Sequence, residues 1–285
     1  MIGIIGGSGL YQMDGWTGAA WQRVTTAWGD PSDELLVGTL DGQAAAFLPR
    51  HGRGHRIPPS DLNFRANIAA LKQLGVTDVL SLSAVGSLRL DLPPGTFVVV
   101  DQFVDRTFAR TKSFFGPGLV AHVSVADPVC RRLGDLIAGT ARELALPTVR
   151  GGTYLAMEGP QFSTKAESEL YRSWGMSVIG MTNMPEAKLA REAELCYATI
   201  AMVTDYDCWH PEHAHVTVDQ VVGVANRNAA AAQRLIRTVV PRLAGRPTPC
   251  PCGCDRALDS AVMTAPGARD PTLVQQLRGI AGRVL

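Results

Sequence analysis

Short apolar runs alternate with segments of helical periodicity along most of the chain. Apolar runs of about four to eight residues between turn-forming residues predict strands. They lie at residues 2–5, 43–48, 76–83, 96–101, 153–157, 176–181 and 197–204. Apolar positions that recur every three or four residues predict helices. These cover residues 61–74, 127–146, 164–174, 185–195, 217–243 and 271–281.

Capping residues sharpen some of these boundaries. Ser60 or Asp61 is the expected N-cap of the first helix, and Gly75 is its expected stop. For the second helix, Asp127 is the expected N-cap and Pro128 the first helical residue.

The alternation of strands and helices favours an α/β fold, in which helices pack on the faces of a sheet that is at least partly parallel. The chain contains no evident internal repeat. The pattern breaks after Leu243, where three prolines and three cysteines fall within residues 247–254. We therefore expect a single α/β domain over residues 1–243, with a cysteine-containing C-terminal extension, residues 244–285, packed on it.

Composition and charge exclude several classes of protein. The 285 residues carry a formal net charge of +1, and 46% are hydrophobic against 19% charged. A charge near zero gives no electrostatic footprint for nucleic acid or an anionic membrane surface. The apolar fraction is too high for a disordered chain, no run reaches the roughly 18 residues of a membrane span, and a secretory signal is not evident. We expect a soluble, cytoplasmic protein that acts on small molecules.

Polar and glycine-rich motifs follow several of the predicted strands. They include Ser8 in a Gly-Gly-Ser-Gly loop, the pairs Arg50-His51 and Ser83-Ala84, Thr182, and the pair Asp205 and Asp207. Ligands of open α/β sheets bind outside the carboxyl ends of the strands. The motifs therefore predict one composite site built from distant parts of the sequence.

Two of these motifs suit an anion. The glycine loop can turn backbone N–H groups and the Ser8 hydroxyl towards an anion, although a plain tight turn fits the same residues. Arg50 and His51 open a loop with further cations, and the planar guanidinium matches phosphate oxygens. A solvated basic loop is the alternative.

The acidic pair suits a different ligand group. Alternate residues of an extended strand face the same way, so Asp205 and Asp207 can face one ligand. Such a pair can bind a metal, relay protons or accept hydrogen bonds from an amino group. Helix capping combined with a surface acid is the alternative.

Aromatic and histidine residues add weaker signals. Phe162 lies in a loop between a strand and a helix, where its ring can stack on a planar base or pack in the core. His210, His213 and His215 fit no standard zinc spacing, so we expect no metal there.

The cysteines of the extension stand close together at Cys250, Cys252 and Cys254. Such C-x-C pairs can hold a metal, form a strained disulfide or transfer redox equivalents. A zinc site normally needs a second ligand pair, and none is evident because the other cysteines are scattered, at positions 130, 196 and 208. We expect reduced thiols and no metal.

Taken together, these motifs resemble the trimeric purine nucleoside phosphorylase family. The resemblance runs from Ile2 to about Leu243 and is densest at residues 50–53, 101–107, 158–163, 181–187 and 204–209. The cysteine-containing extension is similar to one in some microbial members. The resemblance implies a single-domain, three-layer α/β/α sandwich with a mixed, barrel-like central sheet, assembled as a homotrimer or a dimer of trimers.

Within the family, the chain is most similar to members that act on 5′-methylthioadenosine. The resemblance implies phosphorolysis, in which inorganic phosphate attacks C1′ and yields adenine and 5-methylthioribose 1-phosphate for methionine and purine salvage. Phosphate is then a co-substrate, and no metal or other cofactor is implied. Phosphorolysis of 6-oxopurine nucleosides or methylthioinosine, hydrolytic cleavage, and nucleotide binding without catalysis are the alternatives.

The matching positions imply a role for each candidate. Phosphate would be held by Ser8, Arg50 as a bidentate fork, His51, Ser83, Ala84 and Thr182. Met181 would lie against the ribose, Phe162 would pack on the base, and the 5′ end would meet His122 of a neighbouring subunit, Val218 and Val222. Asp205 would share a proton with N7, and Asp207 would accept from the exocyclic amine. An ionised carboxylate repels a 6-oxo group, so this pair favours a 6-aminopurine.

Overall fold

The computed structural model describes residues 1–10, 13–211 and 218–285, without the side chains of Ser8 and Gln220. In this part of the chain, 11 strands form one mixed sheet. They are β1 (Ile2–Gly6), β2 (Trp16–Gln22), β3 (Leu35–Leu40), β4 (Gln43–Pro49), β5 (Asp78–Ser87), β6 (Phe97–Val99), β7 (Gln102–Asp105), β8 (Thr148–Arg150), β9 (Thr153–Ala156), β10 (Val178–Gly180) and β11 (Cys196–Asp205). The α-helices are α1 (Phe64–Gln73), α2 (Arg131–Glu143), α3 (Lys165–Ser173), α4 (Asn183–Glu192), α5 (Val218–Arg242) and α6 (Pro271–Ala281).

Strand β5 is the branch point of the sheet. It runs parallel to β1 and β11 and pairs antiparallel with β10 near its end. The sheet continues through β1, β4, β3 and β2 on one side and through β10, β9 and β7 on the other, while β11 also pairs with β6. Gly86 lies at the division, where a Cβ would lie only 2.9 Å from Asp205 Oδ1 and 3.2 Å from Ile179 Cγ2. The absence of a side chain thus lets three strands meet beside the acidic pair.

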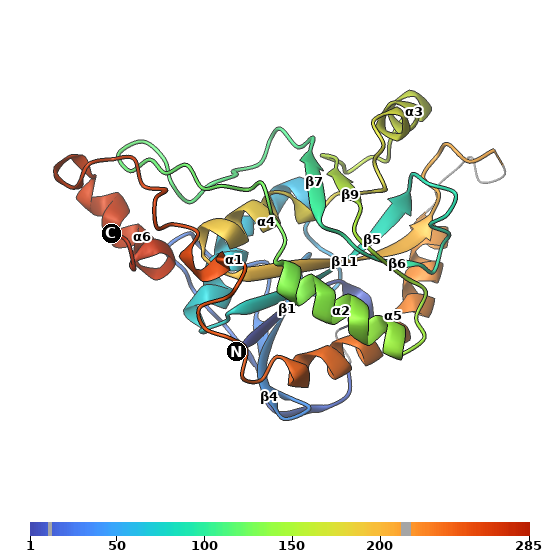
Figure 1. Cartoon of the computed structure of the whole chain (residues 1–285), viewed down its shortest axis with the longest axis horizontal. Coiled ribbons are helices and arrows are strands. Elements are labelled where there is room, and N and C mark those ends of the chain that lie inside the picture. The colour runs from blue at the N-terminus through green and yellow to red at the C-terminus, as the bar shows by residue number, and fades with distance from the viewer. Residues whose placement is uncertain (11–12, 212–217) are drawn as a thin grey trace.

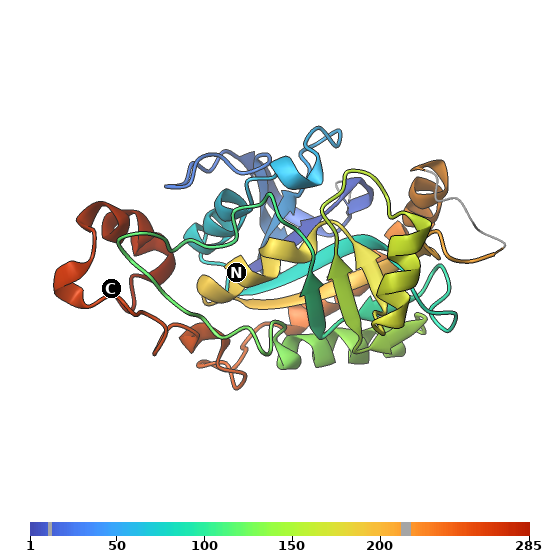
Figure 2. The ribbon, with the colours of Figure 1, turned by 90° about the horizontal axis from the view of Figure 1, so that it is seen from above.

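Helices cover both faces of this sheet, with α2 and α5 on one face and α1 and α4 on the other (Figures 1 and 2). Successive strand residues point to opposite faces, so Ile4 packs in the cluster that includes α2 and α5, and Ile5 packs in the cluster that includes α1 and α4. The layers are those of the expected α/β/α sandwich. None of the described helices is both long and apolar enough to cross a membrane.

Two helix starts differ from the sequence prediction. Helix α1 begins at Phe64, because residues 59–61 form a separate 3-10 turn and Asn63 is the cap that accepts from the Ala66 N–H at 3.1 Å. Helix α2 begins at Arg131 with Cys130 as its N-cap, so the prediction of Asp127 as the cap is wrong. The N–H of Cys130 donates to Tyr197 O at 2.8 Å, and this bond ties the preceding segment to β11 instead of the helix.

Strands β2 and β3 were not predicted from the apolar pattern. They form an antiparallel extension beyond β4, and the residues of β2 alternate between exposed and half-buried. A register shift between Thr17 and Ala20 breaks the alternation of β2 further. A half-exposed strand with a bulge lacks the continuous apolar run that identifies a buried strand.

The chain after α5 packs back against the sandwich. Cys250 and Cys254 are buried in the cluster that includes α2 and β11. Leu277 and Ile280 of α6 are buried in the other cluster, and α6 packs against α1. The tail therefore contributes to both hydrophobic clusters.

Candidate active site

Two hydroxyl groups expected to hold an anion meet at the end of the sheet. Ser83 Oγ of β5 lies 3.0 Å from Thr182 Oγ1, because the antiparallel pairing of β5 with β10 brings the residue after β10 over β5. Thr182 is the N-cap of α4, but its hydroxyl does not cap the helix. The neighbouring Ala84 is exposed, so the backbone at this point is accessible. The hydroxyl pair thus lies at the start of α4, where donors of this kind can bind an anion.

The glycine loop after β1 lies beside this pair of strands. The N–H of Arg50 donates to Gly6 O at 3.0 Å, which joins the end of β4 to the end of β1. The 3-10 turn that begins at Ser8 follows directly. The side chain of Ser8 lies outside the described part of the chain.

Arg50 lies beneath the surface. Its guanidinium donates to both Glu186 oxygens, at 2.8 Å from Nε and 3.1 Å from Nη2, and also to Leu82 O and Ser81 Oγ. Burial alone would lower its pKa, but the Glu186 carboxylate raises it, so Arg50 stays charged. One of its five N–H groups, on Nη1, has no partner among the described residues. The bidentate face that the family resemblance assigned to phosphate is occupied by Glu186.

A buried polar layer supports this ion pair. Ser81 Oγ and the Tyr197 hydroxyl both donate to Glu186 Oε1, at 2.6 and 2.8 Å. The Asn183 side-chain amide donates to the Tyr197 hydroxyl at 2.6 Å and to Thr199 Oγ1 at 2.8 Å. Sequence reasoning did not assign these residues, although Glu186 follows a proline inside one of the motifs. The layer holds the Arg50–Glu186 pair in one arrangement.

His51 is neutral at physiological pH. Its Nδ1 donates to Ile57 O at 2.8 Å, and its ring stacks on His55 with centroids 4.2 Å apart. Burial, with Arg50 as a further cause, lowers the pKa of His51 to about 4. Because Nδ1 carries the proton, Nε2 can only accept a hydrogen bond.

The acidic pair lies at the end of β11, next to the branch in the sheet. The oxygens of Asp205 accept from Thr204 Oγ1 at 2.7 Å and from the Asp207 N–H at 2.8 Å. Oδ2 of Asp207 is buried and has no hydrogen-bond partner among the described residues. Burial raises the pKa of Asp205, and it raises the pKa of Asp207 to about 6. The hydroxyls of Ser168 and Ser163 lie near this carboxyl and lower its pKa in part, but neither forms a hydrogen bond of good geometry with Oδ2.

A buried arginine that sequence reasoning missed holds two loops together. Nη1 of Arg110 donates to Met181 O and Met184 O, both at 2.6 Å, and Nη2 donates to Glu158 O at 2.6 Å. Gly159 lies so close to Met181 that a Cβ would be 2.5 Å from its Sδ, and its φ of 69° is one that glycine adopts without strain. Arg110 thereby fixes the loops that carry Met181 and Thr182.

The expected base and 5′ contacts lie on open surface in the single chain. Phe162 is 42% exposed, and Val218 and Val222 on the first turns of α5 are 65% and 48% exposed. His122 is exposed on the long segment between β7 and α2, which runs out to the C-terminal region before returning (Figure 2). The His122 N–H donates to Ala261 O at 2.8 Å. His122 is thus anchored on the tail.

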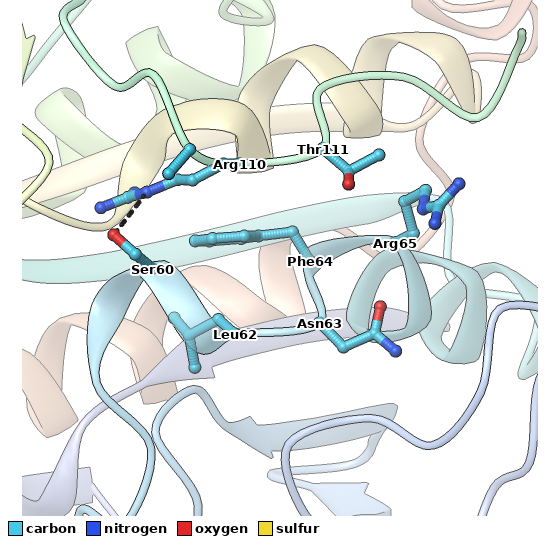
Figure 3. Close-up of a pocket in the computed structure, with 8 residues that line it drawn as sticks. Ser60, Leu62, Asn63, Phe64, Arg65, Arg110 and Thr111 are labelled. Atoms are coloured by element: carbon cyan, nitrogen blue, oxygen red, sulfur yellow. Dashed lines mark hydrogen bonds between the residues drawn. The ribbon is translucent and has the colours of Figure 1, made fainter.

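A partly open pocket of about 120 Å³ lies elsewhere, between the start of α1 and the segment 109–111 (Figure 3). There, the Arg110 guanidinium lies over the ring of Phe64, with Cζ at 5.5 Å from the ring centroid. None of the expected site residues lines this pocket.

Only His210 of the three neighbouring histidines lies within the described residues, so the expectation of no metal there stays a prediction. His210 stacks on Tyr206 with ring centroids 4.7 Å apart. His213 and His215 lie outside the described residues.

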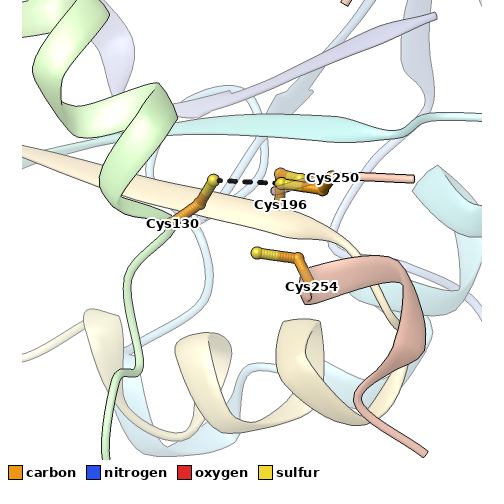
Figure 4. A group of neighbouring side chains, drawn as sticks. All are labelled: Cys130, Cys196, Cys250 and Cys254. Carbon is orange, nitrogen blue, oxygen red and sulfur yellow. Dashed lines mark hydrogen bonds between the residues drawn. The ribbon is translucent and has the colours of Figure 1, made fainter. Parts of the chain in front are cut away.

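The cysteines were wrongly interpreted as scattered. Four buried thiols converge, and their Sγ atoms all lie within 4.8 Å of one another (Figure 4): Cys130, Cys196, Cys250 and Cys254. The fold supplies the second ligand pair that the sequence did not reveal, because Cys130 precedes α2 and Cys196 begins β11.

Known proteins with similar sequences cover the whole chain. The family model described as the phosphorylase superfamily matches residues 1–241. The S-methyl-5′-thioadenosine phosphorylase of Rhodospirillum rubrum is 62% identical over 100% of this chain and 97% of its own length. The protein of the same name from Cereibacter sphaeroides is 60% identical over 100% of this chain and 98% of its own length.

Solved structures agree with these sequences. A methylthioadenosine phosphorylase from an antarctic soil metagenomic library is 45% identical, covers 98% of each chain and superposes with a TM-score of 0.92. The methylthioadenosine phosphorylase of Schistosoma mansoni in complex with adenine is 38% identical, covers 90% of this chain and 96% of its own, and gives a TM-score of 0.85.

Proposed function

This chain belongs to the phosphorylase superfamily, and on that premise we propose which of its residues cleave 5′-methylthioadenosine with phosphate to give adenine and 5-methylthioribose 1-phosphate. The observation that carries the assignment is the placement of the buried Asp207 Oδ2, just beyond the end of β11 and further along the β5–β11 pair than the Ser83–Thr182 hydroxyls. In the β5–β11 pair, Ser83 faces Ala201 and Gly86 faces Asp205. Three residues of strand span about 10 Å, a separation that fits phosphate at one end of a nucleoside and its base at the other.

At the first end, phosphate is the nucleophile. Ser83, Thr182, the Ser8 hydroxyl and the backbone at Ala84 hold and orient it towards C1′. Arg50 adds its remaining Nη1 N–H and its buried charge, so its contribution is one hydrogen bond where the family resemblance implied two. Neutral His51 accepts a hydrogen bond at Nε2 from a P–OH group of the phosphate. Orientation and charge at this point also stabilise the positive sugar of the transition state.

At the other end, the two carboxyl groups serve the purine. Asp207 Oδ2 accepts from the 6-amino group and thereby gains the hydrogen bond it lacks. Asp205, with its raised pKa, shares a proton with N7 so that adenine does not leave as an anion. Phe162 covers the base, and Met181 lies against the ribose. The 6-oxo group of a 6-oxopurine cannot donate a hydrogen bond to the Asp207 carboxylate and would repel it. In a buried site, the loss of this hydrogen bond weakens binding strongly.

The 5′ methylthio group requires a second subunit. Val218 and Val222 are four residues apart on one face of α5, are exposed, and provide one apolar wall. His122 is anchored on the tail of its own chain, so it completes the pocket of a neighbour. We accordingly propose a homotrimer, with residues 1–243 as the catalytic unit and residues 244–285 as an extension packed on it. We propose no cofactor for the reaction, and a cytoplasmic location stays a prediction.

A substrate comparison with and without phosphate tests the assignment. The chain should release adenine from methylthioadenosine only when phosphate is present, and methylthioinosine and inosine should react at least about a hundredfold more slowly. Asp205→Asn should lower methylthioadenosine turnover about a hundredfold, as loss of a proton donor does, whereas exposed Asp127→Asn serves as the control. Equal cleavage without phosphate would refute the anion site, and a preference for inosine would refute the roles of Asp205 and Asp207.

A further inference from the structure

Four cysteines from three separate parts of the chain surround one point in the core. Cys130 lies at the start of α2, Cys196 begins β11, and Cys250 and Cys254 come from the tail (Figure 4). The exposed fraction of each is 3% or less. Their sulfur atoms point towards one another and all lie within 4.8 Å. We propose that this cluster is a structural zinc site that fastens the C-terminal extension to the catalytic domain.

The spacing of the thiols fits one central ion. A zinc ion bound by four thiolates at about 2.3 Å in a tetrahedron holds its sulfur atoms about 3.8 Å apart. The Cys130 and Cys250 Sγ atoms are 3.8 Å apart, and the other pairs lie within the same small sphere. Two disulfides would instead divide the four cysteines into two closely bonded pairs. A polynuclear iron–sulfur cluster would need more room between the thiolates.

The surroundings favour thiolates over neutral thiols. Arg246 Nη1 donates to Cys196 Sγ at 3.0 Å, and the guanidinium of Arg132 lies beside Cys196 and Cys250. Buried Asp78 forms ion pairs with both arginines and holds them at the cluster. A zinc ion with four thiolates carries a net charge of −2, and the two adjacent guanidinium groups lower the cost of burying that charge, although Asp78 and Asp255 share their positive charge. Sulfur ligands in a closed, buried set select zinc among common divalent ions.

The tail loop is shaped to present its two ligands together. Gly253 has a φ of 67° and donates its N–H to Cys250 O at 2.8 Å, which closes a tight turn between the two cysteines. The carboxylate of Asp255 accepts from the Cys250 N–H at 2.9 and 3.0 Å. Cys252, between the two ligands, is not a member of the cluster. The turn therefore directs Cys250 and Cys254 into the cluster and leaves Cys252 outside it.

The site joins the tail to the element that carries the acidic pair. Cys196 begins the same strand, β11, that ends at Asp205. The tail in turn supports the segment that bears His122, whose N–H donates to Ala261 O. In this proposal, the ion stabilises the fold. It also stabilises the placement of His122, the residue proposed to reach a neighbouring subunit, and it takes no part in binding phosphate or purine.

Metal content of the full chain tests the proposal directly. The untagged protein is purified under reducing conditions without chelators and its metals are quantified by mass spectrometry. We expect about one zinc per chain, and at least about tenfold weaker zinc binding in Cys130→Ser, Cys196→Ser and Cys254→Ser. Cys252→Ser is the matched control and should keep its zinc. Stripping the ion should lower the melting temperature, and zinc but not magnesium should restore it.

Binding of cobalt(II) to the zinc-free wild-type chain tests the site without any variant. The result therefore does not depend on whether the cysteine variants fold. A tetrahedral thiolate site should show visible ligand-field bands and a thiolate-to-cobalt charge-transfer band. Absence of stoichiometric zinc together with absence of these bands would overturn the proposal. Two disulfides among the four cysteines, detected by peptide mapping after alkylation without reduction, would overturn it as well. Loss of zinc in Cys252→Ser equal to that in the other variants would contradict the ligand assignment.

Discussion

The guanidinium of Arg50 and the carboxylate of Glu186 form a buried, two-bond ion pair directly beneath the phosphate motifs. The exposed fractions of the two side chains are 2% and 0%. Glu186 thus orients Arg50 and leaves a single N–H, the one proposed above to reach phosphate. In that proposal, the buried charge of the arginine acts on the anion through this one donor and through the field it creates in a dry environment.

Glu186→Gln should weaken phosphate binding and the fold together. The amide cannot balance the Arg50 charge, and breaking a buried ion pair by removing one partner costs about 3–5 kcal/mol. A reoriented Arg50 no longer presents Nη1 to phosphate, so we expect the phosphate KM to rise at least about tenfold. Urea denaturation and phosphate saturation at fixed methylthioadenosine concentration measure the two effects.

Glu192→Gln is the matched control for this experiment. Glu192 is a second buried carboxylate on α4, but it accepts from Ser113 Oγ and the Phe114 N–H, away from Arg50. Its replacement should leave the phosphate KM unchanged even if it lowers stability. A similar rise in both variants would mean that Glu186 acts only through the general stability of α4.

The raised pKa of Asp207 predicts a stability cost that grows with pH. The pKa is about 6 in the folded chain against an ordinary value of 3.8, because burial disfavours the charged form. Between these values the folded state binds more protons than the unfolded state, so its stability falls as pH rises through this window. By pH 7 the cost reaches about 3 kcal/mol.

Asp207→Asn should remove this cost while impairing function. The variant should be more stable than the parent at pH 7 by up to about 3 kcal/mol, with a difference that shrinks towards pH 4. Its methylthioadenosine turnover should fall, because the amide cannot serve as an anionic acceptor for the purine amine. Denaturation series at several pH values on both proteins test this. A difference in stability that does not change with pH would contradict the burial of a charged Asp207.

The sequence predicted the parts of the molecule in which local pattern and burial agree. Strand β11 is buried along almost its whole length and is rich in apolar residues, and the polar residues at the ends of β5 and β11 follow from the geometry of α/β sheets. The start of α2 was misplaced because the N–H of Cys130 bonds to β11, a contact that no local signal encodes.

Long-range pairing explains the other gaps. Arg50 was expected to face phosphate with its fork, but Glu186, far away in sequence, occupies that face. The four clustered cysteines come from positions up to 124 residues apart, from 130 to 254, so only the path of the chain through β11 and the tail unites them. Arg110 has no motif at all, and its importance is visible only in the carbonyl groups that surround it.

Arg110 is a positioning residue whose geometry lysine cannot reproduce. Its two Nη atoms bridge Met181 O and Met184 O on one loop to Glu158 O on another, while Nε contacts the Glu158 side chain at 3.3 Å. An ammonium group keeps the charge but loses the planar fork. The clamp thus holds the backbone at Met181, next to Thr182, the two residues proposed to contact ribose and phosphate.

Arg110→Lys should therefore raise the methylthioadenosine KM about tenfold and lower kcat as well, since a displacement of about 1 Å at reacting groups is costly. Stability should fall by about 3 kcal/mol, because buried carbonyl groups lose charged donors. Arg89→Lys is the control, since Arg89 pairs with Asp91 on the exposed surface and contributes little there. Steady-state kinetics and urea denaturation of both variants provide the comparison. If Arg110→Lys loses stability but keeps both kinetic constants, the clamp supports the fold alone and does not position the substrate.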